Sequence, residues 1–301
     1  MTAVFVEDGV DKGAIWHFGE PNKEQKALVA GTAWADLSHL NVIAVSGADR
    51  LKWLHDLTTQ HLSELGAGQW TSSLILDAQG HVEYQFNLVD DGDTTWLVID
   101  PGYIDTLVAY LQKMKFMLRV DVHDASDEFA VLRAPGAATD LGGPFALVPR
   151  AELKEMQETF SATAMQVGTW ALDAMRVAAG RPRIAFETDH KSIPNELGVL
   201  NKSVHMNKGC YRGQETVAKI FNLGNPPRRL VLLHLDGSQV VMPAPGTPVM
   251  NGEVQVGFLG TVARHFELGP IALAIVKRTT PVDAQLTVEN VAACQQVIVP
   301  A

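Results

Sequence analysis

The sequence predicts an α+β protein that ends in a small β-barrel, and three features of the chain carry this prediction. With 301 residues, of which 47% are hydrophobic and 19% charged, the chain is long enough for about two domains. Up to residue 226, strands and helices mix without the regular repeat of a doubly wound parallel sheet. From residue 227 onward, short strands alternate with turns. We therefore expect antiparallel sheets with helices over residues 1–226, in two subdomains, and a β-barrel over residues 227–301.

The N-terminal part of the chain begins with helical segments and one apolar strand. Asn22–Ser38 has the composition of a helix that is interrupted near Gly31. The short apolar run Val42–Val45 predicts a strand. A capping signal, SGAD, then precedes a helix over Arg50–Leu57, in which leucines recur on one face.

A hairpin, a strand and a long helix follow. The alternation in VEYQFNL predicts that Ser72–Leu76 pairs with His81–Leu88 across a polar turn. Thr95–Ile99 is another strand, and Pro101-Gly102 leads into a helix over Tyr103–Leu118. Four apolar residues at helical spacing predict the core-facing stripe of this helix: Leu107, Leu111, Met114 and Leu118.

The remaining part of the α+β region is predicted to hold one strand and two helices. Glu128–Arg133 has the apolar character of a strand, and Glu152–Thr163 has the pattern of an amphipathic helix. Thr169–Ala179 predicts a further helix that ends at Gly180.

The C-terminal region has the pattern of a small barrel. The segment 222–229 is rich in Asn, Gly and Pro and separates the two regions. Asn251-Gly252 is a strong hairpin signal between two β-rich runs. The main predicted strands are Leu230–Leu235, Pro248–Met250, Val254–Val262, Ile271–Val276 and Gln285–Val288.

Composition excludes several classes of protein. No apolar run approaches the roughly 18 residues that a membrane span needs, and the acidic start has no signal-peptide pattern. The two cysteines, Cys210 and Cys294, give no disulfide framework, and the scattered histidines give no metal-ligand spacing. We expect a cytoplasmic protein without a membrane partner or a metal site.

Charge is unevenly distributed along the chain. Between Arg176 and Leu230, ten Lys and Arg residues face four Asp and Glu residues, whereas the whole chain carries a net charge of −10. This basic segment is consistent with an anionic ligand, but also with charges that lie on different faces and pair locally. Direct nucleic-acid binding is not expected, because most of the surface would repel phosphate groups.

The segment NKGCYRGQET, residues 207–216, is the most informative in the chain. It places one thiol, Cys210, between two cations, Lys208 and Arg212, which can stabilise a thiolate and lower its pKa. The glycines beside them let the backbone approach a ligand. The alternative is a half-buried structural cysteine in a glycine turn, with both cations on a solvated surface.

The motif KGCYRGQE, Lys208–Glu215, resembles the signature of the YgfZ-type folate-binding proteins, which are relatives of the glycine-cleavage T-protein, an aminomethyltransferase. Further segments resemble the same family over nearly the whole chain: Val45–Arg50, Leu54–Gln60, Leu74–Gly80, Met175–Gly180 and Ile193–Leu197. The resemblance implies a T-protein-like folate-binding region followed by a β-barrel, with tetrahydrofolate as the ligand. It also implies a part in the maturation or repair of iron–sulfur proteins, and hence in tRNA modification.

The sequence departs from the T-protein pattern at two places. Where T-proteins carry an acidic pair beside the folate, this chain has Tyr84 and Gln85, and neither can act as a carboxylate base at neutral pH. Glu83 is one residue away and therefore faces the other side of a strand. Ala178 stands where relatives often have a Glu that holds the pterin. Glycine-cleavage activity is therefore doubtful.

The resemblance suggests the following site residues. Arg176 is expected to pair with a folate carboxylate, or else to lie on a helix surface. Glu196 is expected to accept hydrogen bonds from the pterin, or else to be a charge at a helix N-terminus. We also expect Tyr84 near the pterin, and Gln214 and Glu215 to shape the turn that presents the thiol. His205 is a weaker candidate as a partner of the thiol.

Three functions remain open at this point. The first is a tetrahydrofolate-binding accessory protein of iron–sulfur metabolism that acts through Cys210, with iron–sulfur proteins or their assembly factors as partners. One thiol cannot hold a cluster alone, so it would act with a partner's ligands or through a transient adduct. The second is a folate-dependent one-carbon transferase or oxidase, and the third is an interaction scaffold. Folate binding separates the first two from the third.

Overall fold

The computed structural model describes residues 2–138, 143–224, 226–238 and 241–300. Within these ranges no helix is long and apolar enough to cross a bilayer. The predicted break at 222–229 includes residue 225, which lies outside the described residues. The chain forms two compact units, each built from several segments. The first unit comprises residues 1–75, 84–172 and 202–212, and the second comprises residues 76–83, 173–201 and 213–301.

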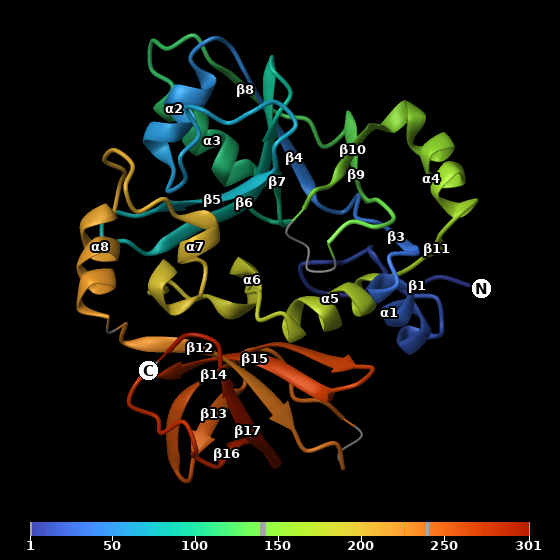
Figure 1. The fold of residues 1–301 in the computed structure, drawn as a ribbon, viewed down its shortest axis with the longest axis vertical. Helices are drawn as coiled ribbons and strands as arrows, with labels where there is room; N and C mark the ends of the chain where they lie inside the picture. The colour runs from blue at the N-terminus through green and yellow to red at the C-terminus, as the bar shows by residue number, and fades with distance from the viewer. Residues whose placement is uncertain (1, 139–142, 225, 239–240, 301) are drawn as a thin grey trace. The chain divides into compact units, whose positions relative to one another are not determined.

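A five-stranded sheet with two helices on one face forms the centre of the first unit (Figure 1). Its strand order is β5-β6-β7-β4-β8. The strands are β4 (Asn41–Ser46), β5 (Thr71–Leu76), β6 (Val82–Asp90), β7 (Thr94–Ile99) and β8 (Asp121–Asp124). Alternate strand residues, such as Ile43 and Val45, share a core with α2 (Arg50–Leu57) and α3 (Ile104–Met114). The predicted strands at 42–45, 72–76, 81–88 and 95–99 are present.

A second, four-stranded sheet in this unit corrects one prediction. Its order is β10-β9-β3-β11, formed by Ala146–Pro149, Phe129–Arg133, Ala33–Asp36 and Met165–Gln166. The helix predicted over Asn22–Ser38 is α1 (Pro21–Val29) only. Gly31, at φ +70°, ends the helical path, and Ala33–Asp36 forms β3 instead. Burial of Trp34 between neighbouring strands outweighs its local helical setting.

The helix predicted over Tyr103–Leu118 is also shorter than expected. It ends at Met114, and Phe116 adopts φ +44°, which no helix continues. Leu107 and Leu111 are fully buried as predicted. Met114 and Leu118 are exposed, so their placement in the core stripe was wrong.

Short elements complete the α+β part. The predicted helices at 152–163 and 169–179 correspond to α4 (Leu153–Ser161) and α5 (Thr169–Ala178). The sequence did not predict the strands β8, β10 and β11. Nor did it predict β1 (Val4–Phe5), β2 (Ile15–His17), the 3-10 turns η1 (Arg150–Glu152) and η2 (Pro194–Glu196), α6 (Ile184–Glu187), α7 (Leu200–Ser203) and α8 (Gln214–Leu223).

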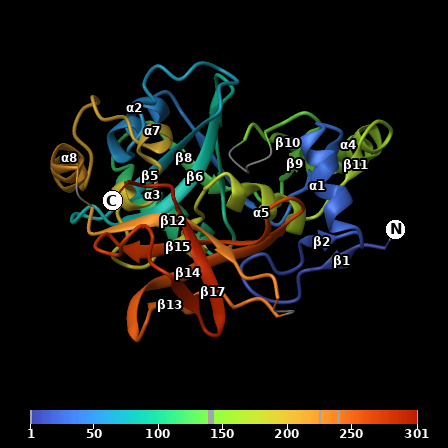
Figure 2. The same cartoon turned by 60° about the horizontal axis from the view of Figure 1, so that its bottom comes forward.

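The C-terminal region is a closed barrel in the order β12-β15-β14-β13-β16-β17. Figures 1 and 2 show its strands in orange and red. They are Arg228–Leu235, Gly269–Lys277, Val254–His265, Pro248–Asn251, Leu286–Val288 and Val291–Val297 in that order. The expected hairpin at Asn251-Gly252 pairs Asn251 with Val254. The predicted fold class, α+β with a C-terminal barrel, is confirmed, whereas the domain boundary at 226/227 stays a prediction.

Candidate functional site

The cysteine loop, residues 207–212, lies in the first unit and presents its thiol to solvent. Cys210 is exposed, as are Gly209 and Arg212 on either side of it. Lys208 and Tyr211 are buried. The loop therefore has two inward anchors and an outward sulfur that a reagent or a partner can reach.

Lys208 fixes the loop to the C-terminal end of α2. Its ammonium group donates hydrogen bonds to the backbone carbonyls of His55, of Thr58 at 2.5 Å and of Gln60 at 3.2 Å. The last carbonyls of a helix lack partners within the helix and carry partial negative charge, so a cation is stabilised there. Burial lowers the pKa of Lys208 to about 8. Its predicted influence on the thiol pKa stays a prediction, since its donors are committed to this helix end.

The second anchor, Tyr211, sits next to the same ammonium group. Lys208 Nζ lies 5.3 Å from the centre of the Tyr211 ring, a cation–π distance. Burial raises the pKa of Tyr211 to about 12, so the phenol is neutral at physiological pH. The anchor therefore combines a cation, an aromatic face and a helix end.

Three histidines surround this anchor. The ring centres of His55 and His61 are 4.7 Å apart, and those of His61 and His205 are 5.2 Å apart. His55 Nδ1 accepts a hydrogen bond from the Leu62 N–H at 3.2 Å. Burial, followed by the nearby Lys208 charge, lowers the pKa of His55. His205 thus belongs to a histidine cluster, and its predicted pairing with the thiol remains untested.

Gln214 and Glu215 open helix α8 immediately after the loop. Gly213, at φ +79°, precedes them and packs closely against the turn before β6. A Cβ at this glycine would lie 2.7 Å from the Asp77 carbonyl oxygen and from the Gly80 Cα. Only glycine fits such a contact. Glu215 in the first helical turn has the favourable sign for the helix dipole.

Arg176 lies deep inside the second unit, where its exposed fraction is 1%. Its Nε donates to Asp173 at 3.0 Å, and its Nη1 donates to Glu187 at 3.3 Å and to the Arg181 carbonyl at 2.7 Å. Its Nη2 donates to Thr261 Oγ1 at 2.6 Å. All three guanidinium nitrogens thus have partners within this unit. The geometry gives Arg176 a structural role, and its predicted contact with a folate carboxylate stays a prediction.

Glu196 is likewise buried, at 1% exposure, and is paired with Arg228. Arg228 Nε and Nη2 donate to the two Glu196 oxygens at 3.0 and 2.8 Å. The same guanidinium donates to both oxygens of Asp189, at 2.6 and 3.0 Å. Arg228 therefore joins two carboxylates to the first barrel strand. The predicted pterin contact of Glu196 is untested.

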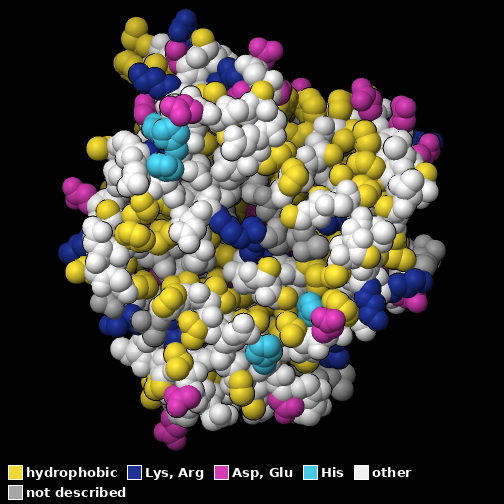
Figure 3. Space-filling model, viewed as in Figure 1, with side chains coloured by type: hydrophobic (Ala, Val, Ile, Leu, Met, Phe, Trp, Pro, Cys, Tyr) yellow, Lys and Arg dark blue, Asp and Glu magenta, His cyan; other side chains and the backbone are white. Residues whose placement is uncertain are grey.

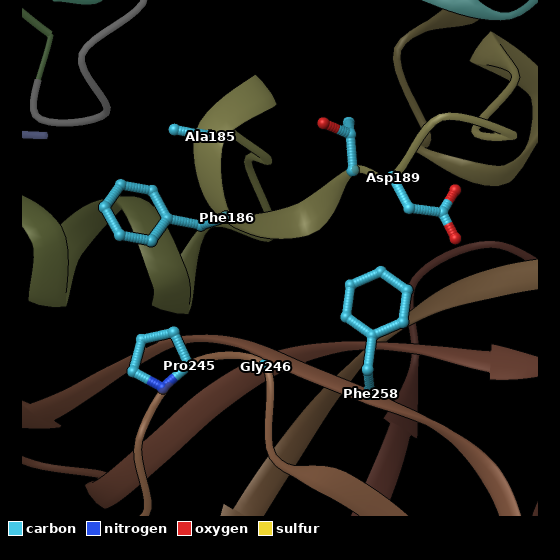
Figure 4. Close-up of a pocket in the computed structure, with 7 residues that line it drawn as sticks. Ala185, Phe186, Asp189, Pro245, Gly246 and Phe258 are labelled. Atoms are coloured by element: carbon cyan, nitrogen blue, oxygen red, sulfur yellow. The ribbon is translucent and has the colours of Figure 1, made fainter.

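Asp189 lines a pocket of about 310 Å³ within the second unit. Figure 4 shows the rings of Phe186, Pro245 and Phe258 around the gap, with the Asp189 carboxylate at one end. Burial alone would raise the pKa of Asp189, but hydrogen bonds from Arg228 and from its neighbours hold it well below its usual range. Apolar walls with one ionised carboxylate suit a flat ring that carries N–H donors.

Tyr84 is half-buried on β6 in the first unit. Its ring centre lies 6.5 Å from that of Tyr103 and 6.2 Å from that of Tyr110, both on or beside α3. These three rings pack against the core of the five-stranded sheet. The expected position of Tyr84 near a pterin stays a prediction.

Comparison with known proteins shows which proteins the chain resembles. The model of the GCVT N-terminal domain matches residues 3–140. The chain is 22% identical to the tRNA-modifying protein YgfZ of Colwellia psychrerythraea, over 80% of this chain and 83% of the relative. It is 24% identical to an iron-sulfur cluster assembly factor IBA57 homolog of Mycosarcoma maydis, over 72% of this chain and 61% of the relative.

A solved structure shares the fold of this chain. The crystal structure of the glycine cleavage system aminomethyltransferase T from Bartonella henselae matches with a TM-score of 0.80, at 16% identity. The match covers 98% of this chain and 92% of that chain. The chain is similar to the YgfZ-type proteins, which are relatives of the glycine-cleavage T-protein. The resemblance read from the KGCYRGQE motif is thereby confirmed.

Sequence reasoning missed two residues that organise the second unit. Arg228 was counted only as one charge of the basic segment, and Asp189 was not considered. No spacing rule could reveal them, because the partners of Arg228 are 32 and 39 residues away in the chain. The missed pocket has the same cause, since its walls come from separate segments.

Proposed function

We propose that this protein is a tetrahydrofolate-binding accessory protein for the assembly or repair of iron–sulfur proteins, and so supports tRNA modification. The observation that carries the proposal is the exposed Cys210 on a loop anchored by Lys208. An exposed thiol can contact the surface of another protein without a change in the fold. The relatives named as a tRNA-modifying protein and as an iron-sulfur cluster assembly factor support this role.

The proposed chemistry belongs to the thiol. The sulfur of Cys210 would act as a transient ligand or adduct-forming group toward a partner, because one thiol cannot complete a cluster site. The exposed Arg212 would favour its thiolate form. Lys208 would act as a positioning residue, since its hydrogen bonds hold the loop rather than the sulfur.

Folate fits the chain's described residues in part. Arg176 and Glu196 are buried and already paired, so their part in folate binding would be indirect, through the residues that they hold in place. Within the second unit, the accessible group suited to a pterin is the ionised Asp189 beside its two phenylalanine rings. Within the first unit, the half-buried Tyr84 keeps its predicted role as a separate candidate. An aromatic side chain can stack on a pterin, and a carboxylate can accept from its amino group.

A folate titration tests the ligand. We expect a saturable change in tryptophan fluorescence when tetrahydrofolate is added to the purified protein. Cys210→Ser should bind equally well, because the thiol is not proposed as a folate contact. If neither protein gives saturation, the ligand part of the proposal is wrong and a scaffold role remains.

Alkylation tests the thiol. We expect iodoacetamide to modify Cys210 at pH 7 faster than it modifies the exposed Cys294, because a neighbouring cation favours the reactive thiolate. Cys210→Ser is the matched control, because Cys294 is also exposed and supplies the background. Equal rates at the two cysteines would rule out an activated thiol. In cells that lack the protein, wild type but not Cys210→Ser should restore the activity of iron–sulfur enzymes.

A one-carbon transferase or oxidase is the second candidate, favoured by the match to the GCVT N-terminal domain. The replacement of the acidic pair by Tyr84 and Gln85 counts against aminomethyl transfer. Mass spectrometry of tetrahydrofolate incubated with the protein and one-carbon donors separates the candidates. Multiple turnovers above the level without protein would replace the accessory role by an enzymatic one.

A further inference from the structure

An exposed apolar turn projects from the first unit between α3 and β8. We name it the apolar knob and define it as Met114, Phe116, Met117 and Leu118. Their exposed fractions are 40%, 87%, 84% and 46%. Adjacent exposed side chains of this size mark contact surfaces more often than chance, and Phe and Met are enriched in such contacts.

The knob is held in a fixed shape by the structure beneath it. The Leu118 N–H donates to the Lys115 carbonyl at 2.9 Å, which closes a tight turn. Trp53 Nε1 donates to the Met114 carbonyl at 3.2 Å. A Cβ on Gly47 would lie 2.1 Å from the Arg119 carbonyl oxygen, so the backbones touch there. A preformed knob loses little conformational entropy when it binds.

Phe116 provides an independent sign of function. Its φ of +44° lies in the left-handed region, which is unfavourable for a bulky side chain and ordinary for Gly or Asn. Its ring is also the most exposed large apolar side chain among the described residues. The side chain thus contributes neither favourable backbone geometry nor core packing. A contact outside the chain accounts for a phenylalanine at this position.

Basic side chains border the knob. Lys52, Lys113 and Arg119 are exposed. Arg119 pairs with Asp49 at 2.8 Å, and Lys115 lies 3.8 Å from Asp121. Figure 3 shows hydrophobic side chains beside Lys and Arg side chains at the corner that α2 occupies in Figure 1. A complementary surface would be apolar at its centre and acidic at its rim.

The knob and the cysteine loop are attached to opposite ends of α2. At its start, Asp49 binds Arg119 of the knob's base. At its end, the His55 and Thr58 carbonyls bind Lys208 of the cysteine loop. A helix of 8 residues spans about 12 Å. This distance is shorter than the width of a typical protein–protein interface, so a protein bound at the knob could also contact Cys210.

We propose that the apolar knob is a docking element that inserts into an apolar pocket rimmed by carboxylates on a partner protein. An anionic membrane fits less well, because an extended anionic surface would meet the chain's net charge of −10, whereas the rim of a pocket meets only the cations beside the knob, such as Lys52 and Lys113. Four apolar side chains are also sufficient as a hot spot in a protein pocket. The proposal holds whether or not folate binds, so folate titration cannot decide it.

Site-specific photo-crosslinking tests the knob. A photoreactive amino acid replaces Met117 in the full chain, and the same amino acid at Val29, which is 61% exposed in the same unit, is the control. We expect cross-links in cells at position 117 but not at 29, mapped to an apolar surface flanked by Asp and Glu. The captured protein, once purified, should bind wild type at least about tenfold more tightly than Phe116→Gly or Lys113→Glu.

Phe116→Gly distinguishes a lost contact from a loss of folding. Phe116→Gly relieves the positive φ and removes only an exposed ring, so its thermal midpoint should equal or exceed that of wild type. Equal cross-linking at both positions, or binding unaffected by Phe116→Gly, would overturn the proposal. Co-sedimentation with vesicles of 3:1 phosphatidylcholine and phosphatidylglycerol, lost in Phe116→Gly, would instead identify a membrane site. Absence of any cross-link at position 117 would also overturn it.

Discussion

At the scale of single residues, Lys208 has the clearest physical role in the cysteine motif. Its ammonium satisfies carbonyls that follow or end α2, and it does so from a buried position. Two separable roles can be assigned to this cation. One is the anchoring of the loop, which the hydrogen bonds establish, and the other is the predicted activation of the thiol.

Replacing Lys208 by Met should loosen the loop. The substitution keeps the aliphatic stem but leaves the carbonyls of His55, Thr58 and Gln60 without this donor. We expect the free energy of unfolding to fall by about 1–3 kcal/mol. Urea denaturation measures this loss, and hydrogen exchange over residues 207–212 should become faster. The exposed Lys219→Met, on α8, is the control and should change neither. An unchanged exchange rate in Lys208→Met would contradict the anchoring role.

Lys208 also predicts a dependence of stability on pH. Burial lowers its pKa to about 8, against about 10.4 in an unfolded chain. Between these values the unfolded state binds more protons than the folded state, so folding becomes more favourable as pH rises. The stability difference between wild type and Lys208→Met should therefore grow from pH 8 to pH 10, by at most about 1.4 kcal/mol per unit of pKa shift. A difference that stays flat or shrinks in urea titrations would refute this assignment.

At the scale of elements, Arg228 joins the first barrel strand to the segment that precedes the cysteine motif. We call its ion pairs with Asp189 and Glu196 the clasp. Its guanidinium group donates hydrogen bonds to Glu196 on η2 and to Asp189 after α6, while its backbone belongs to β12. A neighbouring contact tightens the same region. A Cβ on Gly260 of β14 would lie 2.5 Å from Glu187 Oε1, so glycine permits the buried carboxylate to approach the strand.

Arg228→Met should destabilise the second unit strongly. Glu196, at 1% exposure, would lose its charged partner, and we expect a loss of about 3–5 kcal/mol. The exposed Lys277→Met, on β15 of the same barrel, is the control and should cost little. Thermal or urea unfolding at pH 7 measures both. A loss no larger than that of the control would show that the clasp is dispensable.

The same clasp predicts that the free energy of unfolding falls at acid pH. Arg228 and neighbouring donors hold the pKa of Asp189 below its usual range despite burial. This contribution to stability is complete above the unfolded pKa of about 3.9 and is lost as pH falls below it. The stability advantage of wild type over Arg228→Met should therefore shrink between pH 5 and pH 2.

At the scale of the whole molecule, the barrel has its own closed sheet and its own core. Val231, Leu233 and Leu273 are among its buried residues, and its six strands leave no open edge. Contacts nevertheless group it with residues 76–83 and 173–201 in the second unit. The closed barrel therefore covers only part of the compact unit to which it belongs.

The predicted boundary at 226/227 can be tested with a fragment of residues 227–301. We expect it to fold, because the barrel is closed, but with a lower thermal midpoint than the barrel in the full chain. The fragment loses the contacts of Glu187 with the Thr261 N–H and of Asp189 and Glu196 with Arg228. Circular dichroism during heating measures this. A broad change without cooperativity would place the boundary elsewhere.

Local patterns in the sequence determined the fold class, most strands and the thiol motif. Alternation in VEYQFNL, the Asn251-Gly252 turn and the spacing of KGCYRGQE involve residues close in the chain, so each is readable without coordinates. The same reasoning failed for Ala33–Asp36, because pairing with distant strands outweighed its helical composition.

Only the tertiary structure decided what the predicted site residues contact. Lys208 meets the end of a helix 150 residues earlier, and Arg176 binds Thr261 across 85 residues, so neither contact has a local signature. Apolar residues likewise recur at helical spacing in the sequence as far as Leu118. The helix nevertheless ends at Met114, and the chain turns at Phe116 and exposes the knob. Periodicity reports which residues share a face of a helix, but the packing of distant segments decides where the helix ends and whether that face is covered.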